Sequence, residues 1–126
     1  MANRKIQFSN NEFYHVFNRG VDKRTIFESQ QDLDRFFESM QTFNCINPSG
    51  SIFEQRLIQK GGAAAQKDDE QLVKFVAYCL LPNHFHFILQ QVTDGGISEF
   101  MKRLSGGYTY YFNLVHKRKG SLFQGK

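Results

Sequence analysis

Runs of apolar, aromatic and β-branched residues along the chain predict three strands. Asn11–Asn18 is rich in aromatic and β-branched residues and is soon followed by a glycine, which is typical of a strand that ends in a turn. Leu72–Leu81 is an almost continuous apolar run, and a second run, His84–Val92, follows the dipeptide Pro82-Asn83. Two strands separated by two residues predict a β-hairpin. Ser121–Gln124 has the composition to open a further strand.

Apolar residues at three- and four-residue spacing predict two amphipathic helices. The first spans Gln30–Phe43, and Ser29 with Asp32 three positions later resembles the capping box that starts a helix. The second spans Ile97–His116 and contains Gly106-Gly107. Each glycine inside a helix costs about 1 kcal/mol relative to alanine. We therefore expect a kink or a close backbone approach at this glycine pair.

The order of these elements is strand, helix, strand, strand, helix and incipient strand. This order predicts an α+β fold of the ferredoxin-like type, in which an antiparallel sheet carries both helices on one face. We expect one domain over residues 1–126, since no internal repeat is visible. Residues 44–71 mix small and polar side chains, which favours a long, mobile connection with a short strand or helical turn at Phe53–Ile58.

The second strand of the hairpin contains the sequence His84-Phe85-His86. Because side chains alternate along a strand, the two imidazoles fall on one face, and Phe85 and Phe87 fall on the other. If the phenylalanines face the helices, both histidines stand on the open face of the sheet, where an ion and a ligand can reach them. The pair is therefore a candidate two-ligand metal site. The alternative is two exposed histidines that bind no ion.

Composition limits the class of protein. At 126 residues, of which 40% are hydrophobic, the chain is long enough to bury a core. No stretch approaches the roughly 18 consecutive apolar residues of a membrane span, and the first residues lack the apolar segment of a secretory signal. We therefore expect a cytoplasmic protein with no membrane contact. Cys45 and Cys79 lie in unlike contexts without a C-x-x-C spacing, which favours reduced thiols.

The net charge of +4 is unevenly spread. Polar and basic residues gather where the first strand ends, and basic residues far outnumber acidic ones after Ile97. Such clusters attract polyanions. The residues expected to contact a polyanion are Asn18, Arg19, Arg24, Asn83, Lys102, Arg103, Lys117 and Arg118. For the residues after the first strand, the alternative is an ordinary hydrophilic loop. For Lys117 and Arg118, the alternative is a solvated helix end.

The chain contains three blocks in a specific order: Tyr14–Val21, Leu81–His86, and Tyr108–Asn113 continuing to Gly120–Gly125. Together they resemble the single-tyrosine HUH transposases of insertion elements, especially the REP-associated tyrosine transposases. A His-x-His pair alone is weak evidence, whereas Pro-Asn-His-x-His between two apolar strands, with the other blocks in place, is strong. The resemblance spans nearly the whole chain. It implies a metal-dependent endonuclease of DNA transposition that binds single-stranded or hairpin DNA, usually as a homodimer.

The resemblance also implies the chemistry. A divalent ion, Mg²⁺ or Mn²⁺, held by His84, His86 and a further polar ligand, would polarise the scissile phosphate. A tyrosine oxygen would attack phosphorus, giving a 5′-phosphotyrosine and a free 3′-OH. Imidazole suits Mn²⁺ or heavier metals better than Mg²⁺, so the ligand type leaves the identity of the ion open.

The chain departs from the family at the nucleophile. The family's tyrosine is expected in a Tyr-Ile-x-x-Asn-Pro-like block beyond the Leu-Phe-Gln-Gly segment, and no such block occurs before Lys126. Tyr110 and Tyr108 are the alternative nucleophiles. Tyr108 and Tyr111 fall on the apolar face of the second helix, which favours a core role, and Tyr110 points elsewhere, where it suits stacking on a base. We expect a chain that lacks the nucleophile helix, binds DNA and does not cleave it.

A second interpretation is a nucleic-acid-binding module with an RRM-like sheet and no chemistry. That class places stacking aromatic residues on the open face of its central strands. Here the exposed register of the second hairpin strand holds His84, His86 and Ile88, and no RNP-like run occurs. The transposase-like interpretation is therefore the stronger of the two.

Overall fold

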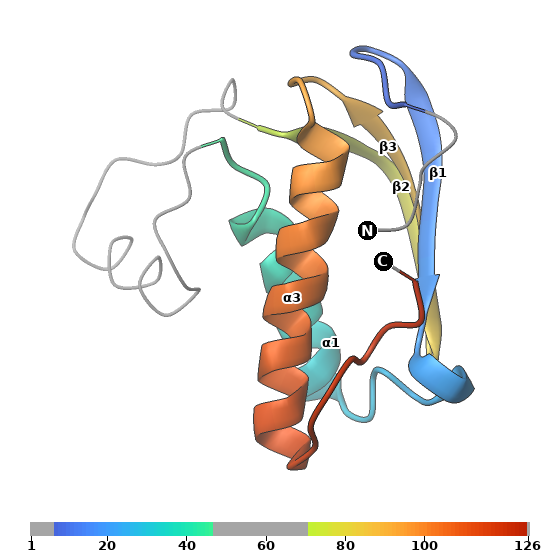
Figure 1. The fold of residues 1–126 in the computed structure, drawn as a ribbon, viewed down its shortest axis with the longest axis vertical. Coiled ribbons are helices and arrows are strands. Elements are labelled where there is room, and N and C mark those ends of the chain that lie inside the picture. Colours follow the sequence, from blue (N-terminus) through green and yellow to red (C-terminus); the bar gives the residue numbers. More distant parts are fainter. Residues whose placement is uncertain (1–6, 47–70, 126) are drawn as a thin grey trace, which may run out of the picture.

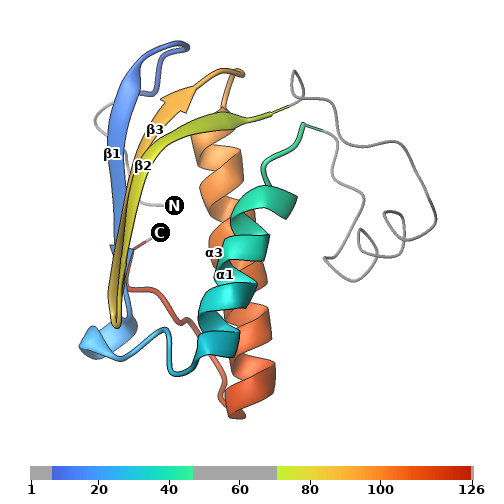
Figure 2. The same cartoon turned by 180° about the vertical axis from the view of Figure 1, so that it is seen from behind.

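The computed structural model describes residues 7–46 and 71–125 as an antiparallel sheet with two helices packed on one of its faces (Figures 1 and 2). The sheet has three strands in the order β1-β3-β2. The elements are β1 (Phe13–Arg19), η1 (Val21–Lys23), α1 (Gln30–Thr42), β2 (Val73–Leu81), β3 (His84–Gln91) and α3 (Gly96–His116). The predicted α+β class, with both helices on one face, is confirmed.

The connections agree with a ferredoxin-like arrangement. Strands β2 and β3 form the predicted hairpin around Pro82 and Asn83, and β3 also pairs with β1. The predicted strand Ser121–Gln124 is wrong as a strand, because this segment makes only an isolated antiparallel bridge between Gly20 and Phe123. It nevertheless runs beside the end of β1, the position of a fourth strand (Figure 1). The C-terminal segment therefore closes one corner of the sheet.

The core lies between the sheet and the helices. Along β3 the buried side chains are Phe85, Phe87 and Leu89, which is the alternation expected of a strand with one covered face. Phe36 of α1 and Tyr108 of α3 are fully buried against this layer, and their rings meet edge to face. This packing turns every second residue of β3 away from the core and onto the open face.

The start of α1 is tied to the end of α3 through a buried carboxylate. Ser29 caps α1 by accepting the backbone N–H of Asp32, as the capping-box pattern predicts. The Asp32 side chain does not complete a capping box. It accepts the backbone N–H of Glu28, and it also binds the Tyr111 hydroxyl at 2.7 Å and His116 Nε2 at 2.9 Å. The two helices are thereby locked together at one end.

The glycine pair in α3 permits a close approach, as predicted. The helix runs without interruption from Gly96 to His116. A Cβ atom at Gly107 would lie 2.6 Å from the Phe43 ring, whereas one at Gly106 would meet nothing within 4 Å. Gly107 therefore lets the end of α1 pack directly on the backbone of α3.

The predicted mobile connection, residues 44–71, starts too early. Asn44 and Cys45 are buried, and the Asn44 side chain accepts the backbone N–H groups of Leu72 and Val73 while donating to the Val73 carbonyl. The end of α1 is thus fastened to the start of β2. The rest of that prediction, including Phe53–Ile58, lies outside the described residues. Both cysteines are free thiols, as expected.

Candidate metal and nucleic-acid site

The open face of the sheet presents side chains in rows set by the strand register. Across one row Arg19 of β1, His84 of β3 and Leu81 of β2 are paired. The next row pairs Phe17, His86 and Cys79. The two predicted ligands therefore share the face that the helices leave free, as the alternation required.

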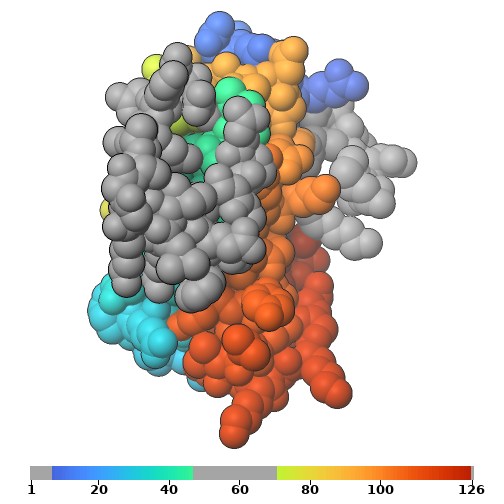
Figure 3. All heavy atoms as spheres, turned by 90° about the vertical axis from the view of Figure 1, so that its left-hand side faces the viewer, coloured from blue at the N-terminus to red at the C-terminus, as the bar shows by residue number. Residues whose placement is uncertain are grey.

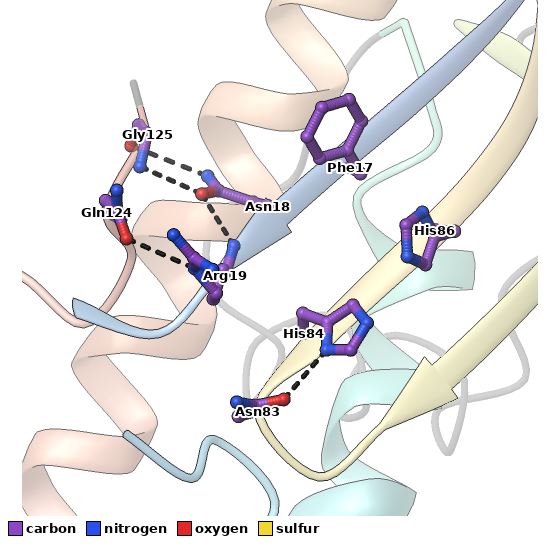
Figure 4. Close-up of a pocket in the computed structure, with 8 residues that line it drawn as sticks. All are labelled: Phe17, Asn18, Arg19, Asn83, His84, His86, Gln124 and Gly125. Atoms are coloured by element: carbon purple, nitrogen blue, oxygen red, sulfur yellow. Dashed lines mark hydrogen bonds between the residues drawn. The ribbon is translucent and has the colours of Figure 1, made fainter. Parts of the chain in front are cut away.

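A pocket of about 590 Å³ opens at the end of these rows. Figure 4 shows that it is built from three segments, which are the end of β1, the start of β3 and the C-terminal segment. Its lining residues are Phe17, Asn18, Arg19, Asn83, His84, His86, Gln124 and Gly125. The structure thus brings five of the predicted site residues together: the two histidines, Asn18, Arg19 and Asn83.

Asn83 determines which nitrogen of His84 is available to a ligand. Its amide nitrogen donates to the Lys23 carbonyl at 3.3 Å, which turns its oxygen toward His84 Nδ1, 2.7 Å away (Figure 4). A carbonyl oxygen only accepts hydrogen bonds, so Nδ1 carries the proton and Nε2 keeps a free lone pair. An imidazole held in this way by an outer partner is typical of metal-binding histidines.

His86 is contacted by a third histidine that the sequence analysis did not include. His15 Nε2 and His86 Nδ1 lie 2.8 Å apart, and the two ring planes are nearly parallel, with centroids 5.0 Å apart. Burial, followed by the neighbouring His15 and His84 imidazoles, lowers the pKa of His86 below its ordinary 6.5. This shift favours the neutral form of His86, the form in which imidazole binds metals. Period-two alternation puts His15 and Phe17 on one face, but only the register shows that this face is shared with His86.

Arg19 and Asn18 hold the C-terminal segment at the pocket. Arg19 Nε donates to Gln124 Oε1 at 3.2 Å, and the Arg19 carbonyl accepts the Gln124 backbone N–H. The Asn18 amide binds Gly125 through both its oxygen and its nitrogen. Arg19 is exposed and supplies a cation to the pocket, whereas the Asn18 side chain is engaged in structure.

The other predicted polyanion contacts lie away from the pocket. Lys102 is exposed on α3, which packs on the covered face of the sheet (Figure 1) and is visible on the side of the molecule drawn in Figure 3. Lys117 and Arg118 lie at the C-terminal end of that helix, and Arg118 donates to the Gly120 and Ser121 carbonyls. Their role in DNA binding stays a prediction.

Arg103 and Arg24 are paired with protein groups. Arg103 forms an ion pair with Glu99 at 2.8 Å and donates to the Cys45 carbonyl. Arg24 forms an ion pair with Glu28 and stands over the Phe112 ring. Both side chains help to hold helix ends in place.

The five tyrosines of the chain are all described, and none lines the pocket. Tyr108 and Tyr111 are buried, as predicted, with their hydroxyls donating to the Ile26 carbonyl and to Asp32. Burial, and then the nearby Asp32 carboxylate, raise the pKa of both phenols well above 10.0. Neither is poised to become a nucleophilic phenolate. Tyr110 is 72% exposed, on the helix layer rather than the sheet face.

The two remaining tyrosines belong to the covered side of the sheet. Tyr14 pairs with Leu89, a core residue, and its hydroxyl accepts the Ser9 backbone N–H. Tyr78 pairs with Phe87 and meets the Phe37 ring of α1 edge to face. No tyrosine of this chain is therefore placed to attack a phosphate bound beside the two histidines.

The donor set fits an ion that takes two imidazoles and completes its shell with oxygen. Within residues 7–46 and 71–125 no group of three or more His, Cys, Asp or Glu side chains is arranged to hold a metal ion. The pocket supplies two histidines and space for water or phosphate, whereas the carboxamide oxygens of Asn83 and Gln124 are already bound to His84 and Arg19. Such a mixed nitrogen and oxygen shell suits Mn²⁺ better than a structural zinc site.

Comparison of the chain with protein-family models, curated proteins and solved structures gives no match. The fold and the site together define an α+β domain with a histidine pair in a pocket on the open face of its sheet. In the part of the chain that is described, neither helix combines the length and apolar character needed to cross a bilayer.

Proposed function

We propose that this chain is a metal-dependent domain of the HUH transposase type that binds single-stranded or hairpin DNA at the pocket beside His84 and His86. The observation that carries the proposal is the placement of both histidines in one pocket, with Nε2 of His84 left free by its Asn83 contact. This is what the resemblance of the Pro-Asn-His-x-His block implies. We also expect the domain to be cytoplasmic and, as the resemblance implies, a homodimer.

The pocket supplies the groups that a strand of DNA needs. Arg19 offers a cation to a phosphate, and Phe17, which is 62% exposed, offers a ring for a base beside the two histidines. A divalent ion on His84 and His86 would polarise the phosphate and offset the charge that develops there. The Asn83 contact orients His84, and the neutral state of His86 keeps its ring available.

This chain is expected to bind DNA without forming a covalent adduct. Attack on phosphorus needs a hydroxyl within about 3 to 3.5 Å and in line with the leaving oxygen. The described tyrosines face the core, the covered side of the sheet or the outer side of α3. Cleavage would therefore require a tyrosine other than these five.

The metal half of the proposal is tested by ion-dependent stability. Mn²⁺ should raise the free energy of unfolding of the native chain by RT ln(1 + [Mn²⁺]/Kd). The double variant His84→Ala, His86→Ala should fold and lose this increase. An equal increase in the double variant would remove both histidines from the site.

The DNA half is tested by a matched pair of charge removals. Arg19→Ala removes a cation from the pocket, and Lys102→Ala removes one from exposed α3. A labelled hairpin with single-stranded flanks should bind the Arg19→Ala chain more weakly than the Lys102→Ala chain. Equal affinities would mean that the pocket is not where the DNA lies.

A second candidate is a non-catalytic nucleic-acid-binding module with an RRM-like sheet. The observation that favours it is the exposure of Phe13 (59%) and Phe17 (62%) on the open face of β1. Exposed rings on a sheet are typical of modules that stack bases. In that case Phe13→Ala and Phe17→Ala would each weaken single-strand binding, and removing Mn²⁺ with a chelator would leave the affinity unchanged.

A further inference from the structure

The contact between His15 and His86 joins two neighbouring strands on the open face. His15 is opposite Ile88 in the register, two pairs along from the Phe17–His86 pair and on the same face, so it reaches His86 diagonally. The ring planes of His15 and His86 are nearly parallel, at 8°, and the Phe17 ring lies beside both, inclined by 25° to the His15 ring and by 29° to the His86 ring. The 2.8 Å separation of His15 Nε2 and His86 Nδ1 is that of a hydrogen bond.

Two neutral imidazoles can make this hydrogen bond in only two ways. If His15 Nε2 carries the proton, His86 Nδ1 accepts it, and the proton of His86 must lie on Nε2. If His86 Nδ1 carries the proton, His15 accepts it, and His86 Nε2 keeps a free lone pair. Only the second arrangement leaves His86 with a nitrogen that can bind a cation.

We propose that His15 is a positioning residue that accepts the Nδ1 proton of His86 and so presents Nε2 of His86 to a divalent ion. The inference rests on the proposed metal site and adds His15 to the residues that shape it, beside His84 and His86. His15 then does for His86 what the Asn83 oxygen does for His84. Each ligand has its own acceptor, one from the turn and one from β1.

Three substitutions at position 15 distinguish a hydrogen-bond acceptor from a ring that only packs against its neighbours. Glutamine at position 15 places its side-chain oxygen as many bonds from Cα as histidine Nε2, so His15→Gln keeps the acceptor. His15→Phe keeps an aromatic ring at this position and removes the acceptor. His15→Asn has an oxygen that is too close to the backbone to reach His86. Because His15 is exposed, all three chains are expected to fold.

Mn²⁺ affinity of the four chains, by isothermal titration, is the first measurement. Loss of an outer-shell partner typically weakens metal binding about 10- to 100-fold. We expect that loss in the phenylalanine and asparagine variants and near-native affinity in His15→Gln. Equal loss in all three variants, or loss in none, would overturn the inference. Absence of Mn²⁺ binding by the native chain would instead overturn the proposed function, and this inference with it.

The second measurement reads the proton directly. Long-range proton–nitrogen spectra of chain labelled with ¹⁵N-histidine and saturated with diamagnetic Zn²⁺ distinguish protonated from unprotonated ring nitrogens. We expect His86 to carry its proton on Nδ1, hydrogen-bonded to an unprotonated His15 Nε2. A protonated His15 Nε2, or a signal showing zinc on His15 itself, would refute the positioning role.

Discussion

Replacing Asn83 with alanine should weaken metal binding while leaving the fold intact. The substitution removes the acceptor that Asn83 provides at His84 Nδ1, and with it the reason for His84 to keep Nε2 unprotonated. The backbone tolerates the change, because Asn83 is not among the residues with positive φ. The backbone hydrogen bond from Gly20 to the Asn83 carbonyl does not depend on the side chain.

The size of the effect follows from the outer-shell role of Asn83. A 10- to 100-fold loss of affinity corresponds to about 1.4 to 2.7 kcal/mol. At a Mn²⁺ concentration 100 times the native Kd, the ion should stabilise the native chain by about 2.7 kcal/mol. In Asn83→Ala the same concentration should stabilise by only about 0.4 to 1.4 kcal/mol.

Urea unfolding of both chains, with and without Mn²⁺, measures this difference. Asn83→Asp is the matched control, because its carboxylate keeps an acceptor for His84 Nδ1 and should retain the stabilisation by Mn²⁺. The reasoning fails if Asn83→Ala is stabilised by Mn²⁺ as strongly as the native chain. It also fails if the aspartate variant loses as much as the alanine variant.

Three further predictions concern the fold and the DNA site. Asn44→Ala should lower the free energy of unfolding by about 2 to 4 kcal/mol in urea melts, because it leaves buried backbone groups at the start of β2 without partners. Gly107→Ala should also destabilise, since its Cβ would overlap the Phe43 ring; a gain in stability, as helix propensity alone predicts, would refute the close approach. Hairpin DNA incubated with the chain and Mn²⁺ should give no covalent protein–DNA species after denaturation. A covalent species that the Tyr110→Phe variant fails to form would show that Tyr110 is the nucleophile and would refute this prediction.

Local sequence was sufficient for both helices, for the three strands of the sheet and for the side of β3 on which the histidines stand. Phe85, Phe87 and Leu89 alternate with His84 and His86, and this alternation alone predicts which side chains face the core and which face outward, because strand periodicity is a property of the backbone. The helical spacing likewise predicted α1 and α3 to within a residue at each end. Gly107 was marked as a place of close approach because a glycine inside a helix has a cost that packing must offset.

The partners of the site residues depended on contacts between distant segments. His15 and His86, which share a hydrogen bond, are 71 positions apart in the chain, and Arg19 and Gln124 are 105 apart. Asn44 binds backbone groups of β2 and its preceding residue that are 28 and 29 positions away. No local pattern encodes such pairs, because they follow from how strands align and where a loop returns. The same holds for the contacts of Arg103 with the Cys45 carbonyl and of Arg24 with the Phe112 ring, which join segments far apart in the chain. Sequence alone therefore determined which groups could do chemistry, and only the packing of the sheet decided which of them meet.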